Sequence, residues 1–484
     1  MPLSRADARF AELVPRGFAR RHLVVGEGPS ADGAAERVAA AARTPPAALH
    51  NLATRLGRRL EVRIADEEEV ARAVDALYEE HGRSRASGGG PGAAAPPGPR
   101  ESVDALLARA DRDLLNLQGK GEVVLLVDAL LFEALGAGAS DVHVQPAARG
   151  TVVRYRVDGV LRDARTLEDG VALAVASRVK VMGRMDIAER RAPQDGRATV
   201  SVGGREVDLR ISTVPTSHGE RVVLRILDRS RRRADFASLG MPPETAASFL
   251  ARARMPNGII LVTGPTGSGK TTTLYATIRE VATAAVNAMT IEDPIEYELS
   301  EEGIQASQAQ VNPRKGITFA TGLRHILRQD PDIVMVGEIR DAETARMAIQ
   351  ASLTGHLVLS TLHTNDAPGA VTRLVDLGVE PCLVSATLSA VLAQRLVRLA
   401  HGGCGGAGCA QCLGTGFLGR TGVYELLVAD EAIRRLVHGG GDAAAVRAAA
   451  RARGMRTLAE EGVRLAEAGA TTREEVERVL AGID

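Results

Sequence analysis

Aromatic side chains and net charge are both scarce in this sequence. Only 2% of its residues are Phe, Tyr or Trp, Trp is absent, and 60 Lys and Arg residues balance 60 Asp and Glu residues. Proteins that bind nucleic acid usually carry a basic excess that contacts phosphates, and aromatic rings on which bases stack. The composition therefore argues against a nucleic-acid-binding protein, and we expect no nucleic acid partner.

Long apolar runs and cysteines are scarce too. A membrane-spanning helix needs about 18 consecutive apolar residues, but the best run, Val123 to Phe132, is interrupted by Asp128. The N-terminus carries charges without the apolar stretch of a secretory signal. Three of the four cysteines fall between Cys404 and Cys412, a clustering that favours a metal site over disulfides in the cytosol. We expect a soluble cytoplasmic protein of about three domains.

Composition divides the chain into four parts. Residues 1–83 form a small first domain with a helical pattern over Asp66–Glu80. Residues 84–100 are rich in Gly, Pro, Ala and Ser, which predicts a flexible linker. Residues 101–232 mix helical and strand-like segments, which indicates an α+β module. Residues 240–484 alternate short apolar runs with helices, the pattern of a buried and mainly parallel α/β sheet, and end in a helical tail.

The segment GPTGSGKT matches the phosphate-loop pattern GxxxxGK[ST]. It follows an apolar strand-like run and precedes a helical segment, which is the context that the mechanism needs. Glycines let backbone N–H groups surround phosphates, Lys270 reaches the β and γ oxygens, and the Thr271 hydroxyl ligates Mg²⁺. The sequence predicts that a nucleoside triphosphate with Mg²⁺ binds at Gly264, Pro265, Thr266, Gly267, Ser268, Gly269, Lys270, Thr271 and Thr272.

Two strand-like runs that end in acidic residues supply candidates for handling water. Glu338 closes the run DIVMVGE, and Glu292 closes the run AMTIE, with Asp293 and Glu296 close behind it. Ligands bind at the carboxyl ends of parallel strands, so we expect Glu338 to orient or deprotonate the attacking water. Glu292 would support the metal or the water. On the sequence alone, either acid is also compatible with a solvated strand end.

Two histidines and two arginines are further candidates. His356 and His363 flank a strand-like run, which fits either γ-phosphate sensing or a structural role. Arg210 and Arg225 lie on strand-like segments joined by the hairpin-like PTSHG. Guanidinium groups suit the charge of a transferring phosphoryl group. These two precede the phosphate-loop domain, however, and would reach a nucleotide only from another domain or subunit; surface ion pairs are the alternative.

The cysteine cluster extends to a histidine, giving His401, Cys404, Cys409 and Cys412 within residues 398–420. Three thiolates and one imidazole can close a tetrahedral Zn²⁺ site, and C-x₂-C is the usual chelating half. Neighbouring glycines permit the tight turns. Unrelated thiols in a glycine-rich loop are the alternative.

Longer motifs in this chain resemble those of the secretion ATPases that serve type II secretion and type IV pilus assembly. Besides the phosphate loop they are ASDVHVQP, RYRVDGVLR, RAPQDGR, STVPTSHGERVVLRIL, TIEDPIEY, LRHILRQDPDIVMVGEIRD, TGHLVLSTLHTNDA and GFLGRTGVYELL. The resemblance covers about residues 101–484. It implies a PAS-like α+β middle domain and a RecA-like ATPase core with a small metal-binding insertion.

The resemblance also implies roles for the candidate residues. Glu292, Asp293 and Glu296 fall in the family's aspartate box, Glu338 falls in its Walker B motif, and both histidines fall in its histidine box. The two arginines occupy positions that reach a neighbouring subunit's nucleotide. The family works as a hexamer on the cytoplasmic face of the inner membrane, where ATP-driven motion turns an F-type platform protein and extrudes pseudopilin.

The metal site departs from the family pattern, and the N-terminus indicates which branch of the family the chain resembles. The family's metal site usually has two C-x₂-C pairs separated by a longer loop, whereas here the first pair is His401-x₂-Cys404 and four residues separate the pairs. The N-terminal PRGFARRH resembles the start of type II secretion members that dock to an L-type bitopic membrane protein. This favours secretion over pilus extension.

Three rival functions remain. A pilus-assembly ATPase shares the chemistry. A nucleic-acid translocase on a RecA-like core is disfavoured by zero net charge and few aromatic residues. A nucleotide sensor that does not hydrolyse ATP is disfavoured because Glu338 accompanies Lys270 and Thr271, and a sensor needs no residue that orients water.

Overall fold

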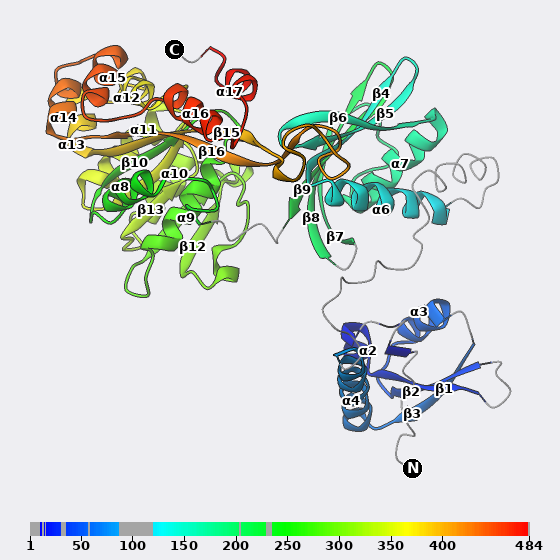
Figure 1. Ribbon diagram of the computed structural model, residues 1–484. Helices are drawn as coiled ribbons and strands as arrows, with labels where there is room; N and C mark the ends of the chain where they lie inside the picture. Colours follow the sequence, from blue (N-terminus) through cyan, green and yellow to red (C-terminus); the bar gives the residue numbers. More distant parts are fainter. Residues whose placement is uncertain are drawn as a thin grey trace. The chain divides into compact units, whose positions relative to one another are not determined.

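Figure 1 shows the computed structural model of the chain. It describes residues 10–11, 14, 16–30, 35–56, 59–86, 120–202, 205–228 and 235–482. The chain divides into two compact units, Met1–Arg100 and Glu101–Asp484. Residues 87–100 of the predicted linker lie outside the described residues.

The first unit is a small sheet with helices packed against it. Its elements are α2 (Arg16–His22), β1 (Val24–Pro29), β2 (Ala35–Ala41), α3 (Pro46–Leu56), β3 (Arg59–Ala65) and α4 (Glu67–Ala86), with strand order β1-β2-β3. β2 pairs antiparallel with β1 and parallel with β3, and α3 makes the crossover between the parallel strands. The predicted helix over Asp66–Glu80 is confirmed as α4, whose first turn is capped by Asp66. It continues into the predicted linker.

The second unit begins with a six-stranded antiparallel sheet. Its helices α6 (Lys120–Gly136) and α7 (Asp169–Met182) pack with the sheet around one apolar core. The strand order is β6-β5-β4-β9-β8-β7. The predicted α+β class is confirmed, and the strands are β4 (Ala139–Ala147), β5 (Gly150–Val157), β6 (Val160–Leu167), β7 (Gln194–Val202), β8 (Arg205–Thr216) and β9 (Gly219–Asp228).

A seven-stranded sheet with order β12-β11-β13-β14-β10-β15-β16 follows. All neighbours pair in parallel except β15 and β16, which are antiparallel, so the predicted mainly parallel sheet is confirmed. The strands are β10 (Gly258–Thr263), β11 (Ala288–Glu292), β12 (Ala306–Gln310), β13 (Ile333–Val336), β14 (Leu357–Leu362), β15 (Leu388–Ala400) and β16 (Phe417–Val428).

Helices cover both faces of this sheet, which explains why its strands are continuous apolar runs. Alternate residues of β10 belong to two separate apolar clusters: Ile259 and Leu261 to one, Ile260 and Val262 to the other. The first cluster includes residues of α10 (Phe319–Ile326), α11 (Ala342–Leu353), α12 (Ala367–Asp376) and α13 (Pro381–Thr387), and the second includes residues of α8 (Pro243–Ala253) and α9 (Lys270–Val281).

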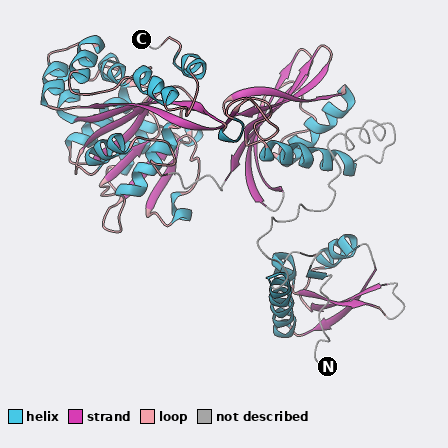
Figure 2. Cartoon of the chain, in the orientation of Figure 1, coloured by secondary structure: helices cyan, strands magenta, loops and turns pink. Residues whose placement is uncertain are grey.

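The C-terminal tail is helical, as predicted, and Figure 2 shows its short helices together at the end of the chain. They are α14 (Glu431–His438), α15 (Ala443–Arg451), α16 (Leu458–Glu467) and α17 (Arg473–Leu480). Each starts after an Asp or Thr whose side chain accepts a hydrogen bond from a backbone N–H of the first turn. None of the described helices combines the length and the apolar composition that crossing a membrane requires.

Candidate active site

The carboxyl ends of parallel strands bring three of the predicted segments to one edge of the seven-stranded sheet. The strands β11, β13, β14 and β10 are successive parallel neighbours. The phosphate loop follows β10, Glu338 follows β13, and His363 follows β14. Ligands bind at this edge in α/β sheets, so strand direction alone assembles a candidate site.

The phosphate loop is a turn between β10 and α9 with the backbone of an anion site. Gly264, Gly267 and Gly269 have φ values of +146°, +81° and +88°, which side chains larger than glycine rarely adopt. Because α9 begins at Lys270, the unpaired N–H groups of its first turn lie beside the loop. The predicted nucleotide-binding residues lie together here: Gly264, Pro265, Thr266, Gly267, Ser268, Gly269, Lys270, Thr271 and Thr272.

Two side chains of the loop have polar groups suited to a phosphate. The Lys270 ammonium donates to the carbonyl oxygens of Gly264 (2.9 Å) and Pro265 (3.0 Å). Burial lowers the pKa of Lys270 to about 8, although the charge of Glu338 acts in the opposite direction. The Ser268 hydroxyl is buried and has no hydrogen-bond partner among the described residues. Buried polar groups are normally paired, so this orphan hydroxyl fits a ligand with acceptor oxygens.

Glu338 lies two residues beyond β13, and its carboxylate contacts Arg340 and His363. Its Oε1 is 2.5 Å from Arg340 Nη2, and its Oε2 is 3.3 Å from His363 Nε2. The Glu338 side chain is 15% exposed. Thr361 helps to fix this region, because its hydroxyl donates to the carbonyl of Gly337 (2.8 Å) and ties β14 to the segment after β13. The geometry therefore brings together Lys270, Glu338 and His363.

His356 is not part of this group within one chain. It precedes β14, and its carbonyl accepts a hydrogen bond from Gly258, the first residue of β10. Its Nδ1 lies 2.8 Å from the carbonyl of Ala351 and 3.1 Å from the Thr354 hydroxyl. Six residues of β14 separate the histidines, a span of about 20 Å. Within one chain His356 therefore lies at the opposite edge of the sheet from His363, and its sensing of the γ-phosphate stays a prediction.

Glu292 is buried in a network of neutral donors rather than directed at the loop. Its side chain accepts hydrogen bonds from Tyr275, from Thr290 (2.6 Å) and from Gln308 (3.0 Å), and the residue is only 2% exposed. Burial raises the pKa of Glu292, although these hydrogen bonds oppose the shift. We expected Glu292 to support a metal or the water directly. Both of its carboxylate oxygens, however, already accept hydrogen bonds within the protein.

The rest of the acidic cluster is exposed. Asp293 and Glu296 follow Glu292 on the surface of the chain. The hydrogen bond to Glu338 is the largest cause that raises the pKa of Arg340, and the charge of Asp293 adds to it. Asp293 is therefore electrostatically coupled to the Glu338 group.

Arg210 and Arg225 lie directly opposite each other on β8 and β9. The Arg225 Nε donates to Asp141 (3.0 Å), and the Arg225 side chain is 57% exposed. Both arginines line a cavity of about 750 Å³ that Glu296 also lines. Their predicted hairpin is confirmed, and both residues line the same cavity as Glu296 of the acidic cluster.

Several polar residues at the site escaped the sequence analysis. Arg340 pairs with Glu338, and Tyr275 and Gln308 hold Glu292. Gln394 and Arg395 are 1% and 4% exposed and lie against the phosphate loop. The sequence does contain a signal for Gln394 and Arg395, because these two polar residues interrupt the apolar run of β15. Buried polar residues in an otherwise apolar strand require partners.

The ligand atoms of His401, Cys404, Cys409 and Cys412 all lie within 4.8 Å of one another. The Cys412 sulfur is 3.9 Å from that of Cys404 and 3.8 Å from that of Cys409, and the Cys409 sulfur is 3.4 Å from His401 Nδ1. A tetrahedral zinc ion with Zn–S bonds of about 2.3 Å requires sulfurs about 3.8 Å apart. The donor set and its spacing therefore fit zinc.

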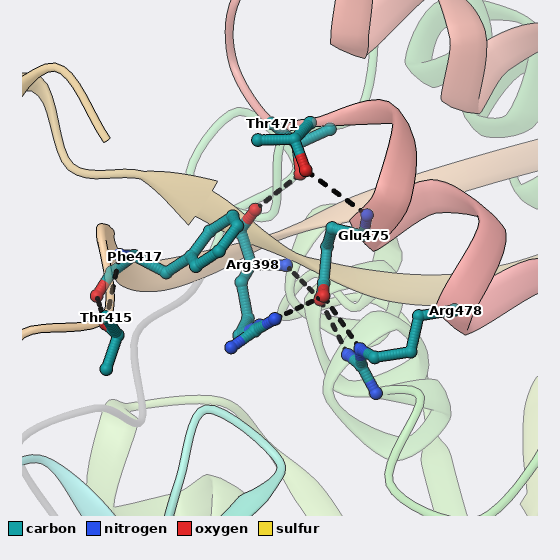
Figure 3. Close-up of polar contacts among 7 residues, drawn as sticks. Arg398, Thr415, Phe417, Thr471, Glu475 and Arg478 are labelled. Atoms are coloured by element: carbon teal, nitrogen blue, oxygen red, sulfur yellow. Dashed lines mark hydrogen bonds and ion pairs between the residues drawn. The ribbon is translucent and has the colours of Figure 1, made fainter. Parts of the chain in front are cut away.

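The metal-ligand loop, residues 401–416, connects β15 to β16, and a polar network holds the strand ends at its base (Figure 3). The fully buried carboxylate of Glu475 on α17 accepts hydrogen bonds from the Arg398 backbone N–H (3.1 Å), the Arg398 side chain (2.6 Å) and the Arg478 side chain. The Arg398 guanidinium also lies 4.1 Å from the centroid of the Phe417 ring. Thr471 donates to the Arg398 carbonyl (2.7 Å). These contacts join both strands of the loop base to the last helix.

Comparisons with known proteins show which family this chain resembles. The family model "Type II/IV secretion system protein" matches residues 116–478, and the model "MshEN domain" matches residues 2–84. The chain is 54% identical over 375 residues to the type II secretion system protein HxcR of Pseudomonas aeruginosa, covering 76% of this chain and 79% of that protein. It is 47% identical over 394 residues to the type II secretion system ATPase E of Vibrio cholerae, covering 76% and 77%.

Solved structures confirm the predicted RecA-like phosphate-loop fold. The pilus retraction motor PilT with bound ADP matches with a TM-score of 0.53 and 29% identity, covering 74% of this chain and 97% of PilT. The Legionella pneumophila ATPase DotB matches in fold, with a TM-score of 0.59 and 24% identity, covering 72% of this chain and 94% of DotB. The expected family is confirmed, and the chain belongs to the type II/IV secretion system proteins.

Proposed function

We propose that this protein is the ATPase that energises type II secretion. It works as a homohexamer on the cytoplasmic face of the inner membrane and drives pseudopilus assembly through an F-type platform protein. The observation that supports this most strongly is the 54% and 47% identity to type II secretion proteins over three quarters of the chain. The phosphate loop and Glu338, which hydrolysis requires, lie within the matched region.

The roles of the site residues follow from their positions. Lys270 and the loop N–H groups bind the phosphates of ATP, and the Thr271 hydroxyl ligates Mg²⁺. Glu338 orients or deprotonates the attacking water, and His363 and Arg340 hold its carboxylate.

Residues outside the loop complete the proposed site. Arg210 and Arg225 stabilise the transferring phosphoryl group of a neighbouring subunit. Because Glu292 is buried, its proposed role is to hold the end of β11. The exposed Asp293 and Glu296 then take the part in metal or water binding first assigned to Glu292.

We also propose that the metal-ligand loop binds zinc through His401, Cys404, Cys409 and Cys412. Elemental analysis of protein purified without chelators should find about one zinc per chain, and Cys409→Ser should lose it. The absence of zinc, together with normal folding of Cys409→Ser, would sink this assignment.

A type IV pilus assembly ATPase is the second candidate, supported by the likeness to the pilus motor PilT. The two candidates differ in the membrane protein that residues 1–83 bind. For type II secretion we propose an L-type bitopic membrane protein as the partner.

Calorimetric titration of the full-length protein with the cytoplasmic domain of the L-type protein from the same genome tests the choice. We expect saturable 1:1 binding. A chain that starts at residue 101 should not bind, yet should retain ATP hydrolysis. Lack of binding by the folded full-length protein would favour pilus assembly.

A further inference from the structure

Gln394 lies on β15 at the point where this strand passes the phosphate loop. β15 pairs in parallel with β10, and Ala393 is the partner of Thr263, the last residue of β10. Gln394 is therefore the next residue of β15, beside the first residue of the loop. It is 1% exposed, so its amide must find its hydrogen-bond partners inside the protein.

The Gln394 amide joins the loop to the helix that follows it. Its Nε2 donates to the carbonyl of Ser268 (2.6 Å), and its Oε1 accepts from the hydroxyl of Thr273 on α9 (2.7 Å). Reversing the amide would set Oε1 against the Ser268 carbonyl, two acceptors facing each other. The hydrogen bonds therefore fix one orientation of the Gln394 side chain.

Both ends of the loop are shaped around Gln394. A Cβ atom on Gly264 would lie 2.4 Å from the backbone carbonyl oxygen of Gln394, and one on Gly269 would lie 2.8 Å from its side-chain Nε2. Two of the glycines that define the motif are thus needed for close contact with this residue as well as for their positive φ angles.

The hydrogen bond to Ser268 sets the direction of a phosphate-binding group. The Ser268–Gly269 peptide is planar and trans, so its C=O and N–H point in opposite directions. When Gln394 holds the Ser268 carbonyl, the N–H of Gly269 points away from Gln394. Backbone N–H groups at this part of such loops bind phosphates.

We propose that Gln394 is a positioning residue that holds the phosphate loop in its nucleotide-binding conformation. It contacts no nucleotide itself and acts through Ser268 and Gly269. It prepares binding of the phosphates, which ATP and ADP share, and leaves the attack of water to Glu338. The proposal rests on nucleotide binding at this loop.

The test is titration of the full-length protein with fluorescent ATP and ADP analogues in the presence of Mg²⁺, with turnover measured at saturating ATP. Gln394→Met keeps the length of the side chain and removes both hydrogen bonds. We expect Kd for both nucleotides and KM for ATP to rise about tenfold, the equivalent of one hydrogen bond, while kcat stays within about twofold.

Two further variants separate positioning from a general packing effect. Thr273→Val removes only the hydroxyl that orients the amide, and it should raise Kd about threefold. In the Gln394→Met, Thr273→Val double variant the two effects should not multiply, because they act through one side chain. Gln350→Met, at an exposed position on α11, is the matched control and should leave Kd unchanged.

Two results would overturn the proposal: wild-type Kd values in folded Gln394→Met, or a fall in kcat at unchanged Kd. If Gln394→Met fails to fold, Thr273→Val becomes the test. An unchanged Kd in folded Thr273→Val would then overturn the proposal. Wild-type protein and Lys270→Ala are titrated alongside. Failure of the wild type to bind nucleotide would refute the proposed function, whereas normal wild-type binding with an unaffected Gln394→Met refutes only the role of Gln394.

Discussion

The neighbouring strands β11 and β13 end at the same edge of the sheet, and each leads to a glutamate. Glu292, on β11, is 2% exposed and accepts hydrogen bonds from three neutral groups. Glu338, beyond β13, is 15% exposed, forms an ion pair with Arg340 and lies 3.3 Å from His363 Nε2. One carboxyl group is therefore buried among neutral donors, and the other is partly exposed beside a charged arginine.

The difference teaches that position on a strand and chemical role are separate questions. A carboxyl group whose pKa is raised by burial and whose oxygens are all engaged serves structure. A partly exposed carboxylate in an ion-pair group beside Lys270 can accept a proton from water.

The largest expected effect is at the β13 end. Glu338→Gln should leave ATP binding intact and reduce turnover at least 100-fold, because general base catalysis typically contributes a factor of this size or more. Phosphate release and nucleotide titration measure the two quantities. Undiminished hydrolysis by this variant would show that Glu338 does not handle the water.

His363, whose Nε2 contacts the Glu338 carboxylate, should matter less than Glu338 itself. His363→Ala should lower kcat about tenfold, since it loosens the carboxylate that positions the water. His356→Ala, at the other end of the same strand, is the matched control and should leave kcat unchanged. Equal losses in the two variants would contradict the separation of the histidines.

Lys270 should make nucleotide affinity at this edge of the sheet depend on pH. Its pKa in the free protein is lowered to about 8, whereas phosphate binding requires the charged ammonium. Above pH 8, binding must therefore take up a proton, and affinity should fall about fivefold between pH 8 and pH 9. Nucleotide titrations over this range measure the effect. In Lys270→Arg the fall should vanish, because arginine stays charged; a persistent fall would assign it to another group.

The smallest effect is expected at the β11 end. Glu292→Gln preserves a buried acceptor for Tyr275 and Gln308, so turnover should change by no more than about twofold. Glu292→Ala leaves these donors unpaired and should lower the free energy of unfolding by about 1–3 kcal/mol. Turnover and denaturant unfolding measure the two outcomes. A loss in Glu292→Gln as large as that in Glu338→Gln would erase the contrast between the strand ends.

Local patterns in the sequence were sufficient to predict the elements of the core. Short apolar runs gave β10, β13 and β14, and the spacing of glycines with Lys270 and Thr271 gave the phosphate loop, because these features depend on residues close together in the chain. The direction of β14 was decisive for the histidines. A segment that contains both His356 and His363 does not by itself say which end of its strand meets the loop.

Burial and long-range partners could not be predicted in this way. Glu292 is buried because residues of other elements, among them Tyr275 and Gln308, close around its carboxyl group. Gln394 meets Ser268 across 126 positions of sequence. Such contacts come from the order of strands in the sheet, which no local pattern encodes.

The order of the strands also has a consequence in time. β10 is the first strand of its sheet in the chain, but its neighbours β14 and β15 are made much later. At a synthesis rate of roughly 5–20 residues per second, Gln394 is added on the order of ten seconds after Ser268. A nascent chain that ends before residue 394 therefore contains the entire phosphate-loop motif and lacks the side chain that holds it.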